Sequence, residues 1–183
     1  MKNLLLLIAC TITLNSWTQD SLATDCKYQK NEVDEFTGSV KMITEQVKFI
    51  SHTDDELKKY YKRKSHDFFE MYISSAYIEE LYVIYFSIRI DSDKSYKTYG
   101  AIRDGDKSII KFKDGNTLEI NYAKSDYGET NYDNKSTVYS SYIILNENQV
   151  KELLTNEIDK IRIYFTKGYV DKSPLEGNSL ANQ

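Results

Sequence analysis

Histidines and acidic residues are the side chains in this sequence most able to bind metal or transfer protons. His52 and His66 have no second ligand at a metal-like spacing, and the chain has no HExxH or paired-cysteine motif. Residues 91–93 and 104–106 each carry two aspartates, as in fragments of calcium loops, but the remaining ligands of an EF-hand are missing. Ordinary turns use the same residues. We therefore expect no metal and no cofactor.

Motifs for nucleophilic or nucleotide chemistry are also missing from the sequence. There is no GxSxG, no P-loop and no glycine-rich dinucleotide turn, and the chain has 7 Gly in all. A glycosidase needs two carboxylates that face each other across a cleft, and the 28 acids here offer no pair that spacing singles out. We assign no catalytic residue and favour a non-enzymatic protein.

Three tyrosines are the only candidate binding residues. Tyr122, Tyr127 and Tyr132 are spaced five apart in the polar stretch 121–136, together with several acids. Such rings can stack on a sugar or on a partner's apolar patch. The alternative is that each ring packs over a sheet and holds the loop in place, which is the common role of aromatic residues near a surface and the interpretation we favour.

The N-terminus has the form of a signal peptide. One lysine precedes an apolar run over residues 4–14, too short to cross a bilayer, and cleavage is expected between Thr18 and Asp20. We therefore expect residues 1–19 to be removed and the mature chain to be exported, periplasmic or extracellular, without a transmembrane segment. The alternative is a lipoprotein anchored through Cys10, because residues 7–10 resemble a lipobox.

Composition bounds the partners and the type of structure. The net charge is −4, and no block of like charge is long enough to suggest nucleic acid. After cleavage Cys26 is the only cysteine, so no internal disulfide framework is expected. The 16 Tyr and 7 Phe against 1 Pro favour strands, where tyrosine can stand on a half-buried face with its hydroxyl in water.

The main core strand is expected over residues 78–90. Its apolar residues fall on alternate positions and so share one face: Tyr82, Ile84, Phe86, Ile88 and Ile90. The opposite face begins apolar and turns polar, which is typical of a strand in the middle of an antiparallel sheet.

A hairpin is expected over residues 108–122, around the turn residues 114–116. A three-residue loop there pairs Phe112 with Leu118 and Ile110 with Ile120, so that apolar residues face each other. The same register pairs Lys111 with Glu119 and gives Asn116 the left-handed position of the loop.

Two helices are expected. One covers residues 54–63, where residues 53–56 form a capping box, and the other covers Glu147–Thr155, with Asn146 as N-cap and Gln149 completing a second capping box. A strand over residues 158–166 follows, with Ile161, Ile163 and Phe165 facing inward.

Together these segments predict one α+β domain over residues 20–171 and a flexible tail over residues 172–183. The domain is mainly antiparallel β, a curved sheet or sandwich of about seven or eight strands, with one or two short helices.

One resemblance adds to this interpretation. The segment LNENQVKELLTNEIDKIRIYFTKGYVD, which follows the KFKDGNTLEI hairpin, resembles small uncharacterised exported proteins of the Bacteroidetes. The resemblance covers roughly residues 78–171. It implies a bacterial envelope setting and brings no activity and no catalytic residues.

We therefore expect an exported, non-enzymatic interaction or structural domain of the bacterial envelope, whose partner is an envelope protein or a glycan. One alternative is a small secreted hydrolase acting on glycans through an acidic pair; two unpaired carboxylates roughly 5 to 9 Å apart in a deep pocket would favour it. Another is a secreted inhibitor or immunity-type protein, which a protruding loop or a flat apolar patch would favour.

Overall fold

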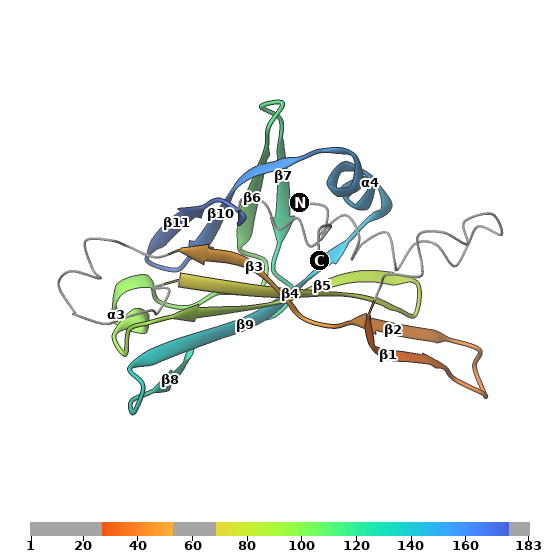
Figure 1. The fold of residues 1–183 in the computed structure, drawn as a ribbon, viewed down its shortest axis with the longest axis horizontal. Helices are drawn as coiled ribbons and strands as arrows, with labels where there is room; N and C mark the ends of the chain where they lie inside the picture. The colour runs from red at the N-terminus through yellow and green to blue at the C-terminus, as the bar shows by residue number, and fades with distance from the viewer. Residues whose placement is uncertain (1–26, 53–68, 176–183) are drawn as a thin grey trace, which may run out of the picture.

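The central strands of the larger sheet are β4 (Phe69–Ile78), β5 (Leu81–Ile90) and β9 (Ser136–Leu145), in a computed structural model that describes residues 27–52 and 69–175 (Figure 1). β5 pairs antiparallel with β4 on one side and with β9 on the other. Ile84, Phe86, Ile88 and Ile90 are buried on one face, which confirms the expected central strand.

The expected strand over residues 78–90 is wrong at its start. Ile78 ends β4, and Glu79 and Glu80 form a two-residue turn into β5. Both glutamates have positive φ, 50° and 68°, the combination that a type I′ hairpin turn requires. Type I′ turns usually contain Asn, Asp or Gly and not glutamate. The sequence therefore gave no turn signal at Glu79 and Glu80, and a single strand was expected across them.

The rest of the larger sheet surrounds these strands. Its order is β1-β2-β4-β5-β9-β8, with β1 at Tyr28–Val33, β2 at Val40–Thr44 and β8 at Glu129–Asn131. β3 (Val47–His52) pairs with the first half of β4, and β2 pairs with the end of β4, so the two strands share one side of it. In the described residues β1 and β8 are therefore the two ends of this order, and the outer side of β3 is a further edge.

The smaller sheet lies above the larger one in Figure 1 and covers its apolar face. Its order is β11-β10-β6-β7, formed by β6 (Lys107–Phe112), β7 (Thr117–Asn121), β10 (Ile158–Phe165) and β11 (Gly168–Lys172). Side chains of both sheets and of α4 (Glu147–Thr155), among them Phe86, Phe112, Leu153 and Ile163, make one core. α4 carries the chain from the larger sheet to the smaller one.

Helix α4 is confirmed with its capping box. The Asn146 side chain accepts from the Gln149 N–H, and the Gln149 side chain accepts from the Asn146 N–H, each at 3.0 Å. A second short helix, α3 (Ser95–Tyr99), was not expected from the sequence. The helix expected at residues 54–63 lies outside the described residues, as do His66, Cys26, residues 1–19 with Cys10, and residues 176–183.

In the described ranges, no helix has both the length and the apolar character needed to cross a membrane.

The register of the β6–β7 hairpin differs from the expected one by two residues. Ile110 pairs with Leu118 rather than with Ile120, and Lys111 pairs with Thr117. The Phe112 N–H donates to the Asn116 carbonyl at 2.9 Å, which leaves a three-residue loop in which Gly115, not Asn116, has positive φ (94°). A slip of two residues keeps every side chain on its face, so apolar matching could not separate the two registers.

The fold class is confirmed: the described residues form a mainly antiparallel α+β structure with two sheets. The strand number is higher than expected, eleven in the described ranges. Two of the additional strands are β8, within the stretch 121–136 that was expected to be a loop, and β11, at the end of the domain. The final described residue, Leu175, still donates its N–H to the Phe49 carbonyl at 3.1 Å.

Candidate functional site

The tip of the β1–β2 hairpin presents an aromatic ring to solvent. Phe36 is 95% exposed and Val33, at the end of β1, is 64% exposed. In Figure 1 this hairpin extends away from the rest of the larger sheet. A nearly fully exposed phenylalanine gains nothing for folding, so its position has to be explained by something other than the core.

The turn that carries Phe36, residues 34–39, is held by hydrogen bonds. Asp34 Oδ1 accepts from the Phe36 N–H at 2.9 Å, from the Thr37 N–H at 2.7 Å and from the Thr37 hydroxyl at 2.9 Å. The Gly38 N–H donates to the Asp34 carbonyl at 2.8 Å, and Gly38 has a φ of 69°. The Thr37 backbone bond, followed by the other two bonds, lowers the pKa of Asp34. The ring therefore stands on an ordered backbone.

Acidic residues surround this tip. The hairpin and the adjacent β4–β5 turn carry five acidic residues: Glu32, Asp34, Glu35, Glu79 and Glu80. The two strands of the hairpin carry two lysines, Lys30 in β1 and Lys41 in β2. An open cleft of about 640 Å³ lies between the hairpin and that turn, lined by residues that include Asn31, Thr37, Tyr77 and Glu80. The tip thus combines an apolar centre with an acidic border.

The three candidate tyrosines do not form one site. Tyr122 is 3% exposed, because its ring packs in the core against Phe86 with 5.5 Å between the ring centroids. Its hydroxyl bonds the Ser108 hydroxyl and donates to the Tyr164 carbonyl at 3.4 Å. Burial raises the pKa of Tyr122 to about 12. For Tyr122 the binding role is corrected and the packing role is the one observed.

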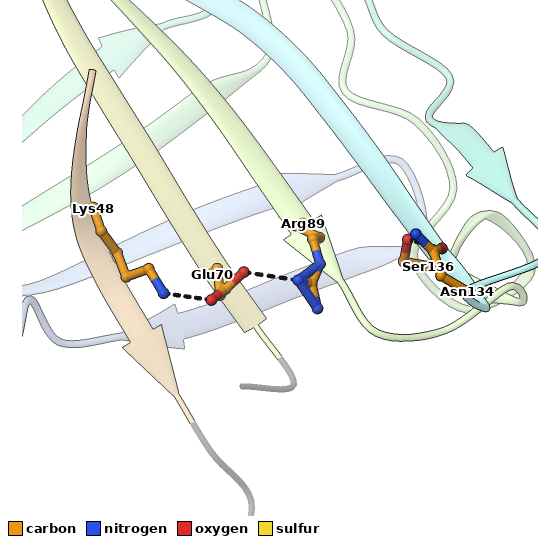
Figure 2. A network of polar contacts seen from close by, with 5 residues as sticks. All are labelled: Lys48, Glu70, Arg89, Asn134 and Ser136. Carbon is orange, nitrogen blue, oxygen red and sulfur yellow. Dashed lines mark hydrogen bonds and ion pairs between the residues drawn. The ribbon is translucent and has the colours of Figure 1, made fainter. Parts of the chain in front are cut away.

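Tyr127 and Tyr132 are 65% and 76% exposed, so the expectation that these two rings pack over the sheet is wrong. Tyr132 lies in the turn between β8 and β9, at the opposite edge of the larger sheet from β1. Asn131 Oδ1 accepts from the N–H groups of Asp133 and Asn134 at 3.0 and 3.1 Å, and the Ser136 hydroxyl donates to Asn134 Oδ1 at 2.6 Å (Figure 2). This second ordered turn also presents an aromatic ring.

Glu70 is the one charged residue that is buried among the described residues, at 6% exposure. It lies on β4 on the face opposite the core, between Lys48 of β3 and Arg89 of β5 (Figure 2). Its Oε1 is 2.5 Å from Lys48 Nζ and its Oε2 is 3.1 Å from an Arg89 nitrogen. The hydrogen bond to Glu70 raises the pKa of Lys48. Both carboxylate oxygens are neutralised, an arrangement that suits a structural ion pair better than a proton donor.

The core itself contains an apolar cavity of about 40 Å³, lined by strand residues of both sheets, among them Phe86 and Ile110, and also by Tyr122 and by Leu153 of α4. A volume close to that of one water molecule cannot hold a sugar ring. Within residues 27–52 and 69–175, no three His, Cys, Asp or Glu side chains are grouped closely enough to hold a metal ion. His52 is exposed at the end of β3.

Phe36 was not among the candidate binding residues expected from the sequence. The sequence does contain a signal for this turn. Asp34 lies two residues before Phe36 and three before Thr37, which is the pattern of an Asx-turn, and such a turn leaves the intervening side chains in solvent. No protein-family model, curated protein or solved structure matches this chain, so its function has to be argued from its own residues.

Proposed function

We propose that this chain is an exported, non-enzymatic interaction domain of the bacterial envelope that binds a partner protein through the tip of its β1–β2 hairpin. The observation that carries the proposal is Phe36, 95% exposed at the end of an ordered turn. Aromatic side chains dominate the binding energy of protein interfaces when they enter a pocket on the partner.

The order of the turn supports the same proposal. A side chain held in its bound position before contact loses little conformational entropy on binding. The hydrogen bonds that Asp34 accepts from Phe36 and Thr37 supply this order for the backbone. The acidic residues around the tip favour a partner whose apolar pocket has a basic border, because complementary charge speeds association and selects the partner.

Export and an envelope setting rest on the sequence. The leader-like residues 1–19 support export, and the resemblance to Bacteroidetes proteins supports the envelope. Mass spectrometry of the protein from envelope and culture fractions tests both forms of export. A mature chain that starts near Asp20 supports export as a cleaved, unanchored protein. A diacylglyceryl group on Cys10 would instead show that the protein is an anchored lipoprotein.

Among the alternatives, the inhibitor or immunity-type protein gains support, because the hairpin is a protruding element that could enter a partner's cleft. The glycan hydrolase gains none from the described residues, since the carboxylate of Glu70 is paired with Lys48 and Arg89. The binding role proposed for Tyr127 and Tyr132 stays open, and the experiment below includes it.

In vivo photo-crosslinking tests the hairpin tip. A photo-reactive phenylalanine analogue replaces Phe36 in the expressing bacterium, and crosslinked products are identified by mass spectrometry. We expect one envelope protein to be captured from position 36. The same analogue at Tyr132, a comparably exposed ring on another ordered turn, is the matched control and should capture nothing specific.

A quantitative arm uses the captured protein once it is identified. We expect Phe36→Ala to weaken binding by at least about tenfold, as for a central aromatic anchor, while Tyr132→Ala leaves the affinity unchanged. Both variants should keep the wild-type melting temperature. If Tyr127→Ala and Tyr132→Ala abolish binding and Phe36→Ala does not, the site is the tyrosine turn; if no variant matters, the proposal fails.

A further inference from the structure

The outer edge of β1 is open. In the described part of the chain β1 pairs with β2 and with no other strand, and Figure 1 shows it as the outermost strand of the larger sheet. Asn31, Glu32 and Val33 are exposed there. An exposed edge is a template for another strand, and proteins usually protect it with charge, with a bulge or by pairing it.

The backbone alternation identifies which groups of β1 face outward. The Asp34 N–H donates to the Ser39 carbonyl of the hairpin at 2.9 Å, so the backbone of Asp34 faces β2. Hydrogen-bonded positions alternate in an antiparallel pair. The backbones of Glu32 and Lys30 therefore also face β2, whereas those of Asn31 and Val33 face the open edge. The β-bulge of β1 lies between Tyr28 and Lys30, so residues 30–33 are regular.

We propose that two copies of this chain pair through β1, antiparallel, about a twofold axis at Asn31. Asn31 then exchanges both backbone hydrogen bonds with the partner's Asn31, because its N–H and carbonyl both point outward. On either side of the axis Lys30 faces the partner's Glu32, and Glu32 faces the partner's Lys30. Two opposite-charge pairs form, and the contact is isologous, as a closed dimer requires.

The charges select this register over its neighbours. A twofold axis at Val33 would place Glu32 opposite the partner's Asp34, and like charges directly opposite each other destabilise an antiparallel pair. An axis at Lys30 or at Glu32 would place that residue directly opposite its own copy, so two like charges would face each other at the centre. An axis at Gln29 falls in the bulge.

The charges already present along β1 fit this dimer. Lys30 Nζ lies 2.8 Å from Glu32 Oε2 within one chain, and the two side chains are 38% and 59% exposed. Across the twofold axis the two pairs form a square in which each lysine has a glutamate beside it on its own strand and another opposite. A lysine on an edge strand normally discourages pairing with a second strand, but here Lys30 faces the partner's Glu32 and its charge is compensated.

This inference does not depend on the proposed function of Phe36. The strands of the dimer run in opposite directions, so the two hairpin tips point to opposite ends of the assembly. If the hairpin tip binds a partner protein, the dimer presents two tips. The dimer then binds with higher avidity than one chain wherever the partner protein is present at high local density. Dimer formation and partner binding are measured separately, so either can fail alone.

Disulfide trapping tests the register. In a Cys10→Ser, Cys26→Ser background, Asn31→Cys places two cysteines across the axis, where paired Cα atoms are about 5.5 Å apart and within disulfide range. Val33→Cys is the matched control: it lies four residues, roughly 13 Å, from its own copy and should not crosslink. We expect a covalent dimer from Asn31→Cys alone. Crosslinking through Val33→Cys instead, or through neither, overturns the proposal.

Charge exchange tests the pairing energy by sedimentation equilibrium. Lys30→Glu brings four glutamates together and should weaken the dimer by about tenfold or more. The exchange Lys30→Glu with Glu32→Lys restores the alternating square and should restore the dimer. Asn31→Pro removes an outward N–H without touching the β2 ladder and should also give monomers. A wild-type chain that stays monomeric at millimolar concentration, or a dimer unaffected by Lys30→Glu, refutes the proposal.

Discussion

The hydroxyl of Tyr139 donates a hydrogen bond of 3.0 Å to the carbonyl oxygen of Gly100. This contact joins β9 to the end of α3 inside the protein, and Tyr139 has no exposed surface. Its ring also packs edge-on against Phe165 of the smaller sheet, with 5.2 Å between the centroids. Tyr139 thus ties together both sheets and the α3 connection.

Alkaline pH should destabilise the fold through Tyr139 and Tyr122. Burial is the main cause that raises each pKa from 10.0 to about 12. The unfolded chain releases both protons near pH 10, and the folded chain retains them until about pH 12, so the free energy of unfolding falls across that window. The loss is on the order of 2 kcal/mol for each tyrosine. Urea melts between pH 8 and pH 12 measure it.

Phenylalanine variants at these two positions are the control for the alkaline loss. Tyr139→Phe leaves the Gly100 carbonyl without its partner and costs about 1 to 3 kcal/mol at neutral pH. Its stability should nevertheless fall less between pH 10 and pH 12 than that of the wild type. An unchanged slope in both variants would show that other groups cause the alkaline unfolding.

Phe86→Ala should lower the free energy of unfolding by about 3 to 5 kcal/mol. Phe86 is 3% exposed on the central strand and borders the existing core cavity, so truncation enlarges a void between the sheets. Denaturant melts check the value. Ser87→Ala, on the opposite face of the same strand, should change stability by less than about 1 kcal/mol. A loss that small for Phe86→Ala would contradict the assignment of β5 as the central core strand.

Gly100→Ala and Gly105→Ala separate a steric clash from backbone strain. Both glycines have positive φ, 82° and 79°, so alanine is strained at either site by about 1 to 3 kcal/mol. Only at Gly100 would the new Cβ collide, 2.1 Å from Thr166 Oγ1. That hydroxyl oxygen accepts from the Ala101 N–H at 2.9 Å and cannot turn away without losing the bond. We expect Gly100→Ala to melt several degrees below Gly105→Ala; equal melting temperatures would mean that the clash relaxes freely.

Asp34→Ala should disorder the hairpin tip without unfolding the domain. The substitution removes the acceptor for the Phe36 and Thr37 N–H groups, so hydrogen exchange of those amides should speed up while the core amides keep their rates. The pKa of Asp34 is lowered, so in the wild type the turn is stabilised above the ordinary aspartate range and loosens only as the pH falls through the lowered pKa. Fast exchange of the wild-type tip at pH 5 would contradict this role.

Local signals in the sequence were sufficient where one segment determined its own structure. Asn146 and Gln149 cap α4 because the motif needs only four consecutive residues. Ile161, Ile163 and Phe165 face inward because alternation on a half-buried strand fixes its face. Signals of this kind were sufficient to predict the fold class and the central strand.

The sequence failed where two local arrangements fitted the same pattern equally well, and where a choice depended on distant residues. The β6–β7 hairpin could shift by two residues without moving any side chain to the other face, and the observed register places Glu119 2.8 Å from Lys107 rather than beside Lys111. Tyr122 looked like its neighbours Tyr127 and Tyr132, but it is buried because Phe86, from a strand distant in sequence, packs against it. For the candidate site, the turn was predictable and the exposure of Phe36 was not.

The turn at Glu79 and Glu80 bears on the order in which the chain assembles. β4 and β5 form the longest ladder among the described strands, and a connection of only two residues joins them. Little loop-closure entropy therefore opposes their pairing. β9 must return from more than forty residues farther along the chain before it can pair with β5. We therefore expect the β4–β5 hairpin to be the folding nucleus, formed in the transition state before β9 joins. Glu80→Gly, which relieves the positive φ at that position, should then accelerate refolding more than it slows unfolding.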